Sequence, residues 1–331
     1  MQAEALWHEA PRQSAIRAET VAPQPGDVVV RTQWSAISRG TERLVWRGGV
    51  PASERERMRC PRQGGDFPFP VKYGYAAVGV VEAGPPALVG RSVFALHPHQ
   101  TLFAIPADAV TPLPDGLPPR RATLAANMET ALNALWDSGA TAGDRIAVVG
   151  AGPLGLLTAA LLARLPGADV TLVDVIERRR AIAPHIGVKF TVPSSAPEGC
   201  DLAFHVSASE SGLETAMAAL GPEGVLVEMS WHGDGRVAVP LGGAFHALRL
   251  RLVSSQVGAI PPSRRPRWTH ARRMALALDL LRDPVFDRLI TTETEFADLP
   301  ERLPAILEGG PDDLAAVIRY PARLDAAAGR A

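Results

Sequence analysis

Two of the chain's three tyrosines, Tyr73 and Tyr75, flank Gly74 in the apolar segment VKYGYAAVGVV (Val71–Val81). A tyrosine can bury its ring and keep its hydroxyl at the surface, which is a packing role. It can also donate a hydrogen bond or a proton inside a reaction site. The segment by itself leaves both roles open.

A permanent positive charge occurs in AISRGTE (Ala36–Glu42), at Arg39, two residues before Thr41. An arginine has five hydrogen-bond donors, so Arg39 could hold a substrate oxygen or carboxylate. A structural explanation is equally open, because Glu42 could pair with Arg39 and Thr41 could cap a turn.

Two histidines lie close together in FALHPHQ (Phe94–Gln100). In a strand, His97 and His99 would share one face because side chains alternate. Imidazole changes its charge near neutral pH, so either histidine could act as an acid or base. Two histidines can also join a metal site, but no third ligand is evident, and a polar loop is the alternative.

The strongest motif is IAVVGAGPLGLL, which holds Gly150-x-Gly152-x-x-Gly155 between an expected strand and an expected helix. The three glycines permit the tight turn, the approach of a pyrophosphate and close packing of the helix. Pro153 and Leu154 open the helix, whose free N–H groups and positive dipole end suit phosphates. The motif predicts a dinucleotide site, against the alternative of a nucleotide-free domain of the same fold.

Asp174 follows the next expected strand, 19 residues after Gly155. A carboxylate there can bind the adenosine ribose diol and favours NAD over NADP, whose 2′-phosphate would meet its charge. Arg178, Arg179 and Arg180 blur this preference, so NADP stays open.

The order of the expected strands and helices along the chain predicts an α/β protein. Short β-branched runs such as Asp27–Trp34 and Ala76–Gly84, separated by Gly and Pro, indicate a β-rich region up to about residue 115. A helix over Arg121–Ala140 follows, and then strands alternate with helices, which is typical of a parallel sheet wound on both faces. The expected strands are Arg145–Gly150, Asp169–Val175, Glu223–Trp231, Leu250–Gly258 and Ala315–Pro321, and the expected helices are Pro153–Leu165 and Thr269–Asp283.

The composition excludes several classes of protein. The chain has 331 residues, which suits two domains, and its net charge of -1 argues against nucleic-acid binding. Two cysteines, Cys60 and Cys200, are too few for a disulfide framework or a cysteine-built zinc cluster. No signal peptide and no apolar run of about 18 residues is present, so we expect a soluble cytoplasmic protein without a membrane partner.

The chain resembles the medium-chain dehydrogenase/reductase superfamily over nearly its whole length. The resemblance is carried by AISRGTE, KYGYAAVG (Lys72–Gly79), the helix Arg121–Ala140, the glycine motif and the tail. It implies a GroES-like β-barrel catalytic domain (1–125 and 260–331) and a doubly wound Rossmann domain (126–259). The ISRGTE element looks more like a zinc-lacking branch that includes the bacteriochlorophyllide dehydrogenases, without implying their substrate.

The departures from the zinc alcohol dehydrogenases concern the metal ligands. Where those enzymes carry Cys-Gly-Thr-Asp and Gly-His-Glu, this chain has Arg39-Gly40-Thr41-Glu42 and Gly74-Tyr75-Ala76, and Ala126 aligns with the third ligand. Zinc needs thiolate, imidazole or carboxylate ligands, so we expect no zinc.

The same resemblance assigns candidate roles. Tyr75 would face the nicotinamide and substrate, while Tyr73 would pack, and a neighbouring cation could favour the Tyr75 anion. Thr41 matches the proton-relay hydroxyl of the zinc enzymes, and Glu42 matches an acid that in those enzymes lies next to the metal ligands. His97 and His99 would lie near the substrate. The expected cofactor contacts beyond the glycine motif are Thr130, Ser207–Ser209, Ser230 with Trp231, and Ser255 with Gln256.

The leading hypothesis is a zinc-independent NAD(P)(H) oxidoreductase that interconverts a hydroxyl and a carbonyl on a small substrate. The basic segment Pro261–Arg273, with Trp268 among its arginines, could stack on a flat heteroaromatic ring such as a pterin, or be a solvated loop or dimer contact. An enone or quinone reductase and a non-catalytic nucleotide sensor are the alternatives. The resemblance implies a homodimer.

Overall fold

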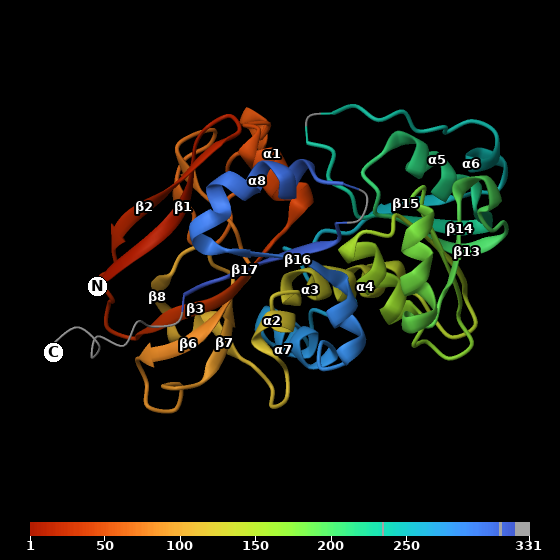
Figure 1. Ribbon diagram of the computed structural model, residues 1–331. Helices are drawn as coiled ribbons and strands as arrows, with labels where there is room; N and C mark the ends of the chain where they lie inside the picture. Colours follow the sequence, from red (N-terminus) through yellow and green to blue (C-terminus); the bar gives the residue numbers. More distant parts are fainter. Residues whose placement is uncertain (234, 311–312, 322–331) are drawn as a thin grey trace, which may run out of the picture. The chain divides into compact units, whose positions relative to one another are not determined.

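The computed structural model describes residues 1–233, 235–310 and 313–321, which form two units (Figure 1). Unit 1 is Met1–Ala126 with the described residues from Ile290 onward, and unit 2 is Asn127–Leu289. No helix in the described ranges is long and apolar enough to cross a membrane.

Unit 1 consists mainly of antiparallel strands. One sheet has the order β2-β1-β5-β4, and a larger one has the order β16-β17-β3-β6-β7-β9, with β8 also paired to β3. Its strands are β1 (Gln2–Ala10), β2 (Gln13–Thr20), β3 (Asp27–Ile37), β4 (Gly64–Gly65), β5 (Val71–Lys72), β6 (Ala77–Ala83), β7 (Ser92–Ala95), β8 (Leu102–Pro106), β9 (Val110–Pro112), β16 (Ile290–Glu295) and β17 (Ala315–Arg319). Its helices are α1 (Arg39–Trp46), α2 (Pro119–Ala122) and α8 (Leu299–Glu308), with short 3₁₀ turns at Ala52–Glu54, Ala107–Ala109 and Phe296–Asp298.

Alternation along β3 explains how unit 1 forms its core. Val28 and Val30 are buried on one face of β3 and pack with apolar residues of β6, β7 and β8, whereas Val29 packs in a separate cluster with Ala3, Val21 and Leu102. A second cluster joins α8 to α1, because Leu303 and Ile306 pack against Trp46. Burying each such side chain contributes about 1.5–3 kcal/mol, so α1 is held firmly by its apolar face.

Unit 2 is built on a six-stranded sheet with the order β12-β11-β10-β13-β14-β15, in which every neighbouring pair is parallel. This is the doubly wound order of dinucleotide-binding domains. Its strands are β10 (Arg145–Val149), β11 (Asp169–Val173), β12 (Lys189–Thr191), β13 (Cys200–His205), β14 (Leu220–Glu228) and β15 (Arg251–Ser254). Its helices are α3 (Ala125–Ser138, which begins in unit 1), α4 (Pro153–Leu162), α5 (Glu210–Ala218), α6 (Ala244–Ala247) and α7 (His270–Leu280), with 3₁₀ segments Glu177–Ile186, Pro193–Ser195 and Pro284–Leu289.

The expected α/β class with a doubly wound sheet is confirmed, and two boundaries need correction. The segment 260–289 lies in unit 2, not with the N-terminal domain. The physical reason is Arg273 of α7, which is buried and donates to Glu129 (3.0 Å) and to the carbonyl of Val257 (2.6 Å). The helix expected over Arg121–Ala140 is divided into α2 and α3, and it ends before Gly139, whose φ is +71°.

Candidate functional site

The sequence-predicted catalytic residues all lie in unit 1. Arg39, Thr41 and Glu42 share the first turns of α1, and Tyr75 follows β5. The segment of His97 and His99 follows β7 and is not a strand, so the expectation that the two histidines share a strand face is wrong.

Glu42 is a buried acid held from two sides. Its Oε2 lies 2.9 Å from Nε2 of His99, and its Oε1 accepts from the backbone N–H of Ser38 at 2.7 Å. Glu42 is 1% exposed and His99 is fully buried. Glu42 therefore pairs with His99, and the proposed pairing with Arg39 is corrected; Nη2 of Arg39 lies 3.9 Å from Oδ2 of Asp313.

A chain of hydrogen bonds continues from this pair. Nδ1 of His99 lies 2.8 Å from Oγ of Ser35, and that hydroxyl lies 3.0 Å from the hydroxyl of Tyr320. The four side chains Glu42, His99, Ser35 and Tyr320 form what we call the relay cluster. Because each member can exchange a donor role for an acceptor role, the cluster can move a proton without moving a heavy atom.

Gly74 allows His99 to reach Glu42, which explains the glycine between the two tyrosines. Gly74 has a φ of +129°, and a Cβ placed there would lie 3.0 Å from both Cδ2 and Nε2 of His99. The imidazole ring thus packs on the bare backbone of the tyrosine segment. Tyr73 is buried and donates to the carbonyl of Met58 at 3.0 Å, which agrees with its expected packing role.

Tyr75 is half-buried beside the relay cluster. Burial and the charge of Glu42 raise the pKa of Tyr75 to about 12, although hydrogen bonds with Ser38 and Thr41 act in the opposite direction. The expectation that a neighbouring cation favours its anion is therefore wrong, because the dominant neighbour is an anion. Tyr75 remains a hydrogen-bond donor over the physiological pH range.

His97 and His8 are two further buried histidines of unit 1. Burial lowers the pKa of His97 to about 3, its ring stacks on Phe103 with centroids 3.9 Å apart, and its Nδ1 lies 2.9 Å from the carbonyl of Pro98. Burial also lowers the pKa of His8 to about 4, with smaller effects from Glu42 and His99. Sequence reasoning missed His8, whose Nε2 is buried without a hydrogen-bond partner in the described part of the chain.

In unit 2 the glycine motif forms the expected strand–turn–helix. Gly150 has a φ of +115°, and a Cβ on it would lie 2.8 Å from the backbone N of Ser207. A Cβ on Gly155 would overlap the carbonyl oxygen of Gly150 at 1.8 Å, whereas one on Gly152 would meet nothing within 4 Å. The open space is therefore at the glycine where α4 begins, beside Pro153 and Leu154, so these residues fit a dinucleotide pyrophosphate.

Asp174 is bound to the glycine loop and to one arginine. Its Oδ2 accepts from the N–H of Ala151 at 2.6 Å and from Nη1 of Arg179 at 3.0 Å, and its Oδ1 accepts from the N–H of Ile176 at 2.8 Å. Arg178 is exposed on the 3₁₀ segment that follows. Arg179, one of the three arginines expected to blur the preference for NAD over NADP, thus offsets part of the charge of Asp174.

Three of the remaining predicted cofactor contacts, Ser207, Ser230 and Ser255, follow the carboxyl ends of strands in unit 2, and the fourth, Thr130, lies on a helix. Ser207 and Ser230 follow β13 and β14, and the Ser230 hydroxyl accepts from the N–H of Ala208 at 3.1 Å. Thr130 lies on α3, half-buried. Ser255 donates to Asp137 of α3 at 2.7 Å, so its hydroxyl serves the protein's own packing.

The basic segment Pro261–Arg273 is largely engaged within unit 2. Arg272 stacks over Trp268 at 4.0 Å, and Arg264 lies over Trp136 at 5.4 Å. Arg273 is buried against Glu129. Three arginines of the segment therefore already contact side chains of unit 2, which weakens the interpretation of the segment as a site that stacks on a substrate ring.

Comparison with known proteins gives partial sequence relatives. No protein-family model matches the chain. An uncharacterized zinc-type alcohol dehydrogenase-like protein of Haemophilus influenzae is 38% identical over 93 residues, which span 28% of this chain and 27% of that protein. The (R,R)-butanediol dehydrogenase of Bacillus subtilis is 25% identical over 251 residues, which span 61% of this chain and 70% of that enzyme.

Solved structures extend the likeness to the whole chain. The Bacillus subtilis 2R,3R-butanediol dehydrogenase has a TM-score of 0.76 at 20% identity and covers 97% of this chain and 100% of its own. An Escherichia coli alcohol dehydrogenase complexed with NADH has a TM-score of 0.76 at 18% identity, covering 96% and 99%. The chain therefore has the fold of the medium-chain alcohol dehydrogenases, with Rossmann and GroES-like domains. The bacteriochlorophyllide-type branch stays a prediction.

Proposed function

We propose that the protein is an NAD(P)(H)-dependent oxidoreductase that interconverts a hydroxyl and a carbonyl on a small substrate without zinc. The observation that carries this is the buried Glu42–His99 pair, which continues through Ser35 to Tyr320. Oxidation of a hydroxyl releases a proton, and reduction of a carbonyl consumes one. A chain of exchangeable groups beside Thr41 and Tyr75 is what that chemistry requires.

The cofactor would be held by unit 2. Gly152, Pro153 and Leu154 present the open N-terminus of α4 to the pyrophosphate, and Asp174 with Arg179 would contact the adenosine ribose. When bound, the nicotinamide supplies hydride transfer. We propose NAD as the preferred form, with Thr130, Ser207 and Ser230 as further contacts.

The residues at the family's zinc positions do not fit zinc. Arg39 is a cation, Ala126 has no ligand atom, and Tyr75 has a pKa of about 12, so its phenolate is not available near neutral pH. We therefore derive no step through zinc at these positions. Arg39 and the hydroxyls of Tyr75 and Thr41 are the groups that would hydrogen-bond the substrate oxygen and stabilise its developing charge.

The substrate is the least constrained part of the proposal. Arg39 supports a substrate with a polar or acidic group. A heteroaromatic, pterin-like ketone is kept in the first screen, beside simple ketones, hydroxyketones and enones, although the basic segment no longer supports it.

The test begins with fluorescence titrations of the chelator-treated protein with NADH and, separately, NADPH. Micromolar binding of NADH, followed by NADH consumption with a ketone, would support the proposed reaction. Consumption with enones alone would indicate an enone reductase. Binding without turnover on the panel would indicate a nucleotide sensor, and no binding of either cofactor would refute the oxidoreductase assignment.

A homodimer is proposed through β15, which is an outer strand of the unit 2 sheet and exposes Leu252 (41%). Outer strands offer unpaired backbone groups to a second copy. Light scattering should give twice the chain mass for the wild type and a lower mass for Leu252→Lys. Buried free thiols at Cys60 and Cys200 suit the reducing cytoplasm, which is the location we propose.

A further inference from the structure

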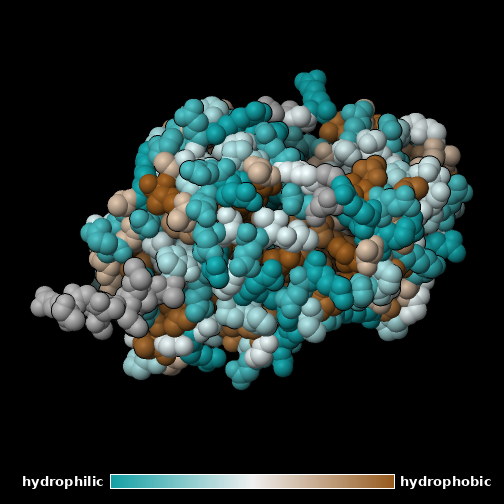
Figure 2. All heavy atoms as spheres, viewed as in Figure 1, coloured by the Kyte–Doolittle hydropathy of each residue, from teal (hydrophilic) through white to brown (hydrophobic). Residues whose placement is uncertain are grey.

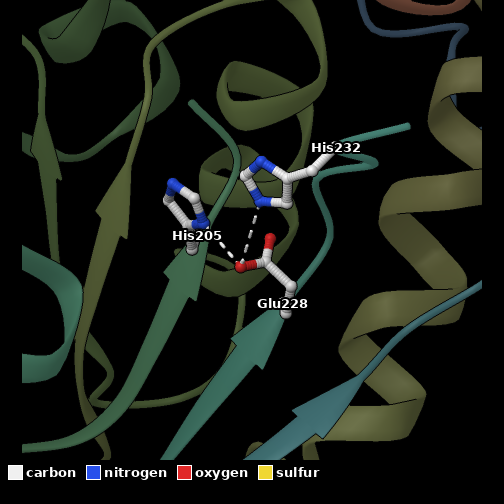
Figure 3. Close-up of side chains that lie close together, drawn as sticks. All are labelled: His205, Glu228 and His232. Carbon is white, nitrogen blue, oxygen red and sulfur yellow. Dashed lines mark hydrogen bonds and ion pairs between the residues drawn. The ribbon is translucent and has the colours of Figure 1, made fainter. Parts of the chain in front are cut away.

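A cluster of two histidines and a glutamate lies in unit 2, whereas the residues assigned to the proposed proton chemistry belong to unit 1. His205 ends β13, Glu228 ends the neighbouring strand β14, and His232 lies in the segment after β14 (Figure 3). One ligand atom from each residue lies within 4.8 Å of the other two. Within the described ranges, this is the one group of three such side chains that meets this distance.

Adjacent parallel strands explain why these residues meet. His205 and Glu228 are paired in the β13–β14 register, so their side chains leave the same end of the sheet. Nδ1 of His205 lies 2.7 Å from Oε2 of Glu228, and Nε2 of His232 lies 3.8 Å from the same oxygen. Both rings point toward this carboxylate in Figure 3, and they are stacked with their centroids 5.9 Å apart.

We propose that Nδ1 of His205, Oε2 of Glu228 and Nε2 of His232 form a binding site for a divalent transition-metal ion. Two imidazoles and one carboxylate are a ligand set that zinc accepts, with the fourth position left for water or another ligand. Binding would replace the proton between His205 and Glu228 with the metal.

The distances are close to those that a metal needs. Ligand atoms at about 2.1 Å from zinc, in tetrahedral directions, lie about 3.4 Å from each other. The 2.7 Å contact must therefore open and the 3.8 Å contact must close, each by less than about 1 Å. His232 lies outside the strand, so its segment can supply this adjustment.

The surrounding hydrogen bonds prepare each ligand. Oγ of Ser207 lies 2.8 Å from Nε2 of His205, where it would accept the ring N–H while Nδ1 binds the metal. Oε1 of Glu228 accepts from the N–H of Ser230 at 2.7 Å, which orients the carboxylate with Oε2 toward the two imidazoles. Nε2 of His232 is buried and has no hydrogen-bond partner in the described chain, which leaves its lone pair for a cation.

The choice of ion follows from the ligands. Imidazole and carboxylate together suit zinc, iron and manganese, and affinity within that series favours zinc. The site adjoins the glycine loop, because the N–H of Val206 donates to Val149 at 2.9 Å and Ser207 borders Gly150. An ion here would therefore fix the segment of Ser207, which we proposed as a cofactor contact, without taking part in the relay cluster.

The test is a calorimetric titration of the chelator-treated full chain with Zn²⁺, repeated with Co²⁺ to record the ligand-field spectrum of a tetrahedral site. We expect one equivalent to bind with micromolar or tighter affinity. His232→Ala and Glu228→Gln should each weaken binding at least about tenfold, and Ser207→Ala should weaken it about tenfold. His246→Ala is the matched control, because His246 is an exposed histidine of the same unit, and it should bind zinc as the wild type does.

Three results would overturn the assignment. They are no zinc binding by the wild type, equal zinc affinity of wild type and His232→Ala, and weakening by Glu42→Gln in place of His232→Ala. The last result would place zinc in unit 1 and would also refute the zinc-independent function. Among the described residues, the side chain of His232 is recorded in a 3.8 Å contact with Glu228 and a ring contact with His205, so its replacement should leave the fold intact, as a thermal melt can check. The readout is metal binding, so it stands whether or not a substrate is found.

Discussion

Glu42 and His99 are 57 residues apart in the chain, yet Oε2 of the acid lies 2.9 Å from Nε2 of the imidazole inside unit 1. Neither side chain is open to solvent. A buried acid and base in contact share a proton whose position responds to any charge that develops beside them. Thr41 lies on the same helix as Glu42, and Tyr75 hydrogen-bonds to Thr41. The Glu42–His99 pair is therefore placed to respond to chemistry at the hydroxyls of Thr41 and Tyr75.

Replacing Glu42 with Gln should lower turnover about 100-fold while leaving NADH binding unchanged. Gln keeps an oxygen for the N–H of Ser38 but cannot accept a proton, and general acid–base groups contribute at least about this factor. Stopped-flow measurement of NADH consumption checks this. Glu308→Gln, at an exposed glutamate of α8 paired with Arg47, is the control. Equal turnover of wild type and Glu42→Gln would exclude the relay role.

Gly74→Ala should destabilise unit 1 and separate His99 from Glu42. The new Cβ would lie 3.0 Å from the imidazole and would require a φ of +129°, a strain of about 1–3 kcal/mol. Urea unfolding measures the loss. Gly90→Ala is the control, because Gly90 has a φ of +80° but nothing within 4 Å of its Cβ position. If both variants lose the same free energy of unfolding, the contact with His99 has no separate cost.

Arg179→Ala should shift cofactor preference toward NADH. Arg179 lies 3.0 Å from Asp174, and without it the carboxylate would repel a 2′-phosphate more strongly. We expect the ratio of the NADPH Kd to the NADH Kd to rise about tenfold, equivalent to about 1.4 kcal/mol. Fluorescence titration gives both constants. Arg164→Ala, at a surface arginine paired with Asp283, should leave the ratio unchanged. A fall in the ratio would show that Arg179 does not neutralise Asp174.

Stability should fall as the pH is lowered below about 6.5, because burial lowers the pKa of His8 to about 4 and that of His97 to about 3. The unfolded chain binds these protons first, so acid favours unfolding until the pH falls below both folded values. Each histidine should cost about 2 kcal/mol at pH 5.

Urea midpoints between pH 7 and pH 5 measure this loss of stability. His97→Leu keeps an apolar partner for Phe103 and removes one titrating group, so it should lose less stability over that range than the wild type. An equal slope in the two proteins would show that His97 is protonated in the folded state.

The local patterns in the sequence predicted the parts of the fold that depend on neighbours in the chain. The glycine motif required a strand, a turn and a helix within twelve residues, and the structure has them at β10 and α4. The helix expected over Thr269–Asp283 is α7, which begins one residue later because Thr269 caps it, with its hydroxyl accepting from the N–H of Arg272 at 3.1 Å. The assignment of 260–289 failed because the buried pairing of Arg273 with Glu129 joins residues 144 positions apart.

In the candidate sites, too, contacts between residues far apart in the chain could not be predicted from local patterns. His99 was a candidate, but Ser35, which hydrogen-bonds to it, lies on β3. Tyr320, which hydrogen-bonds to Ser35, follows β17, and no local pattern in the sequence joins these residues. The His205–Glu228–His232 cluster had a readable signal that was missed. His205 and Glu228 end consecutive parallel strands, and the ends of such strands meet at one edge of the sheet.

The place of β17 in unit 1 has a consequence for how the protein is made. β17 lies between β16 and β3 in the larger sheet, although β3 is synthesised near the beginning of the chain. Unit 2 is complete by Leu289, so a ribosome synthesises all of it before it synthesises β17, the partner strand of β3. During that interval the Trp34–Ile37 part of β3 lacks its partner strand, and this unpaired edge can pair with other nascent chains unless a chaperone covers it.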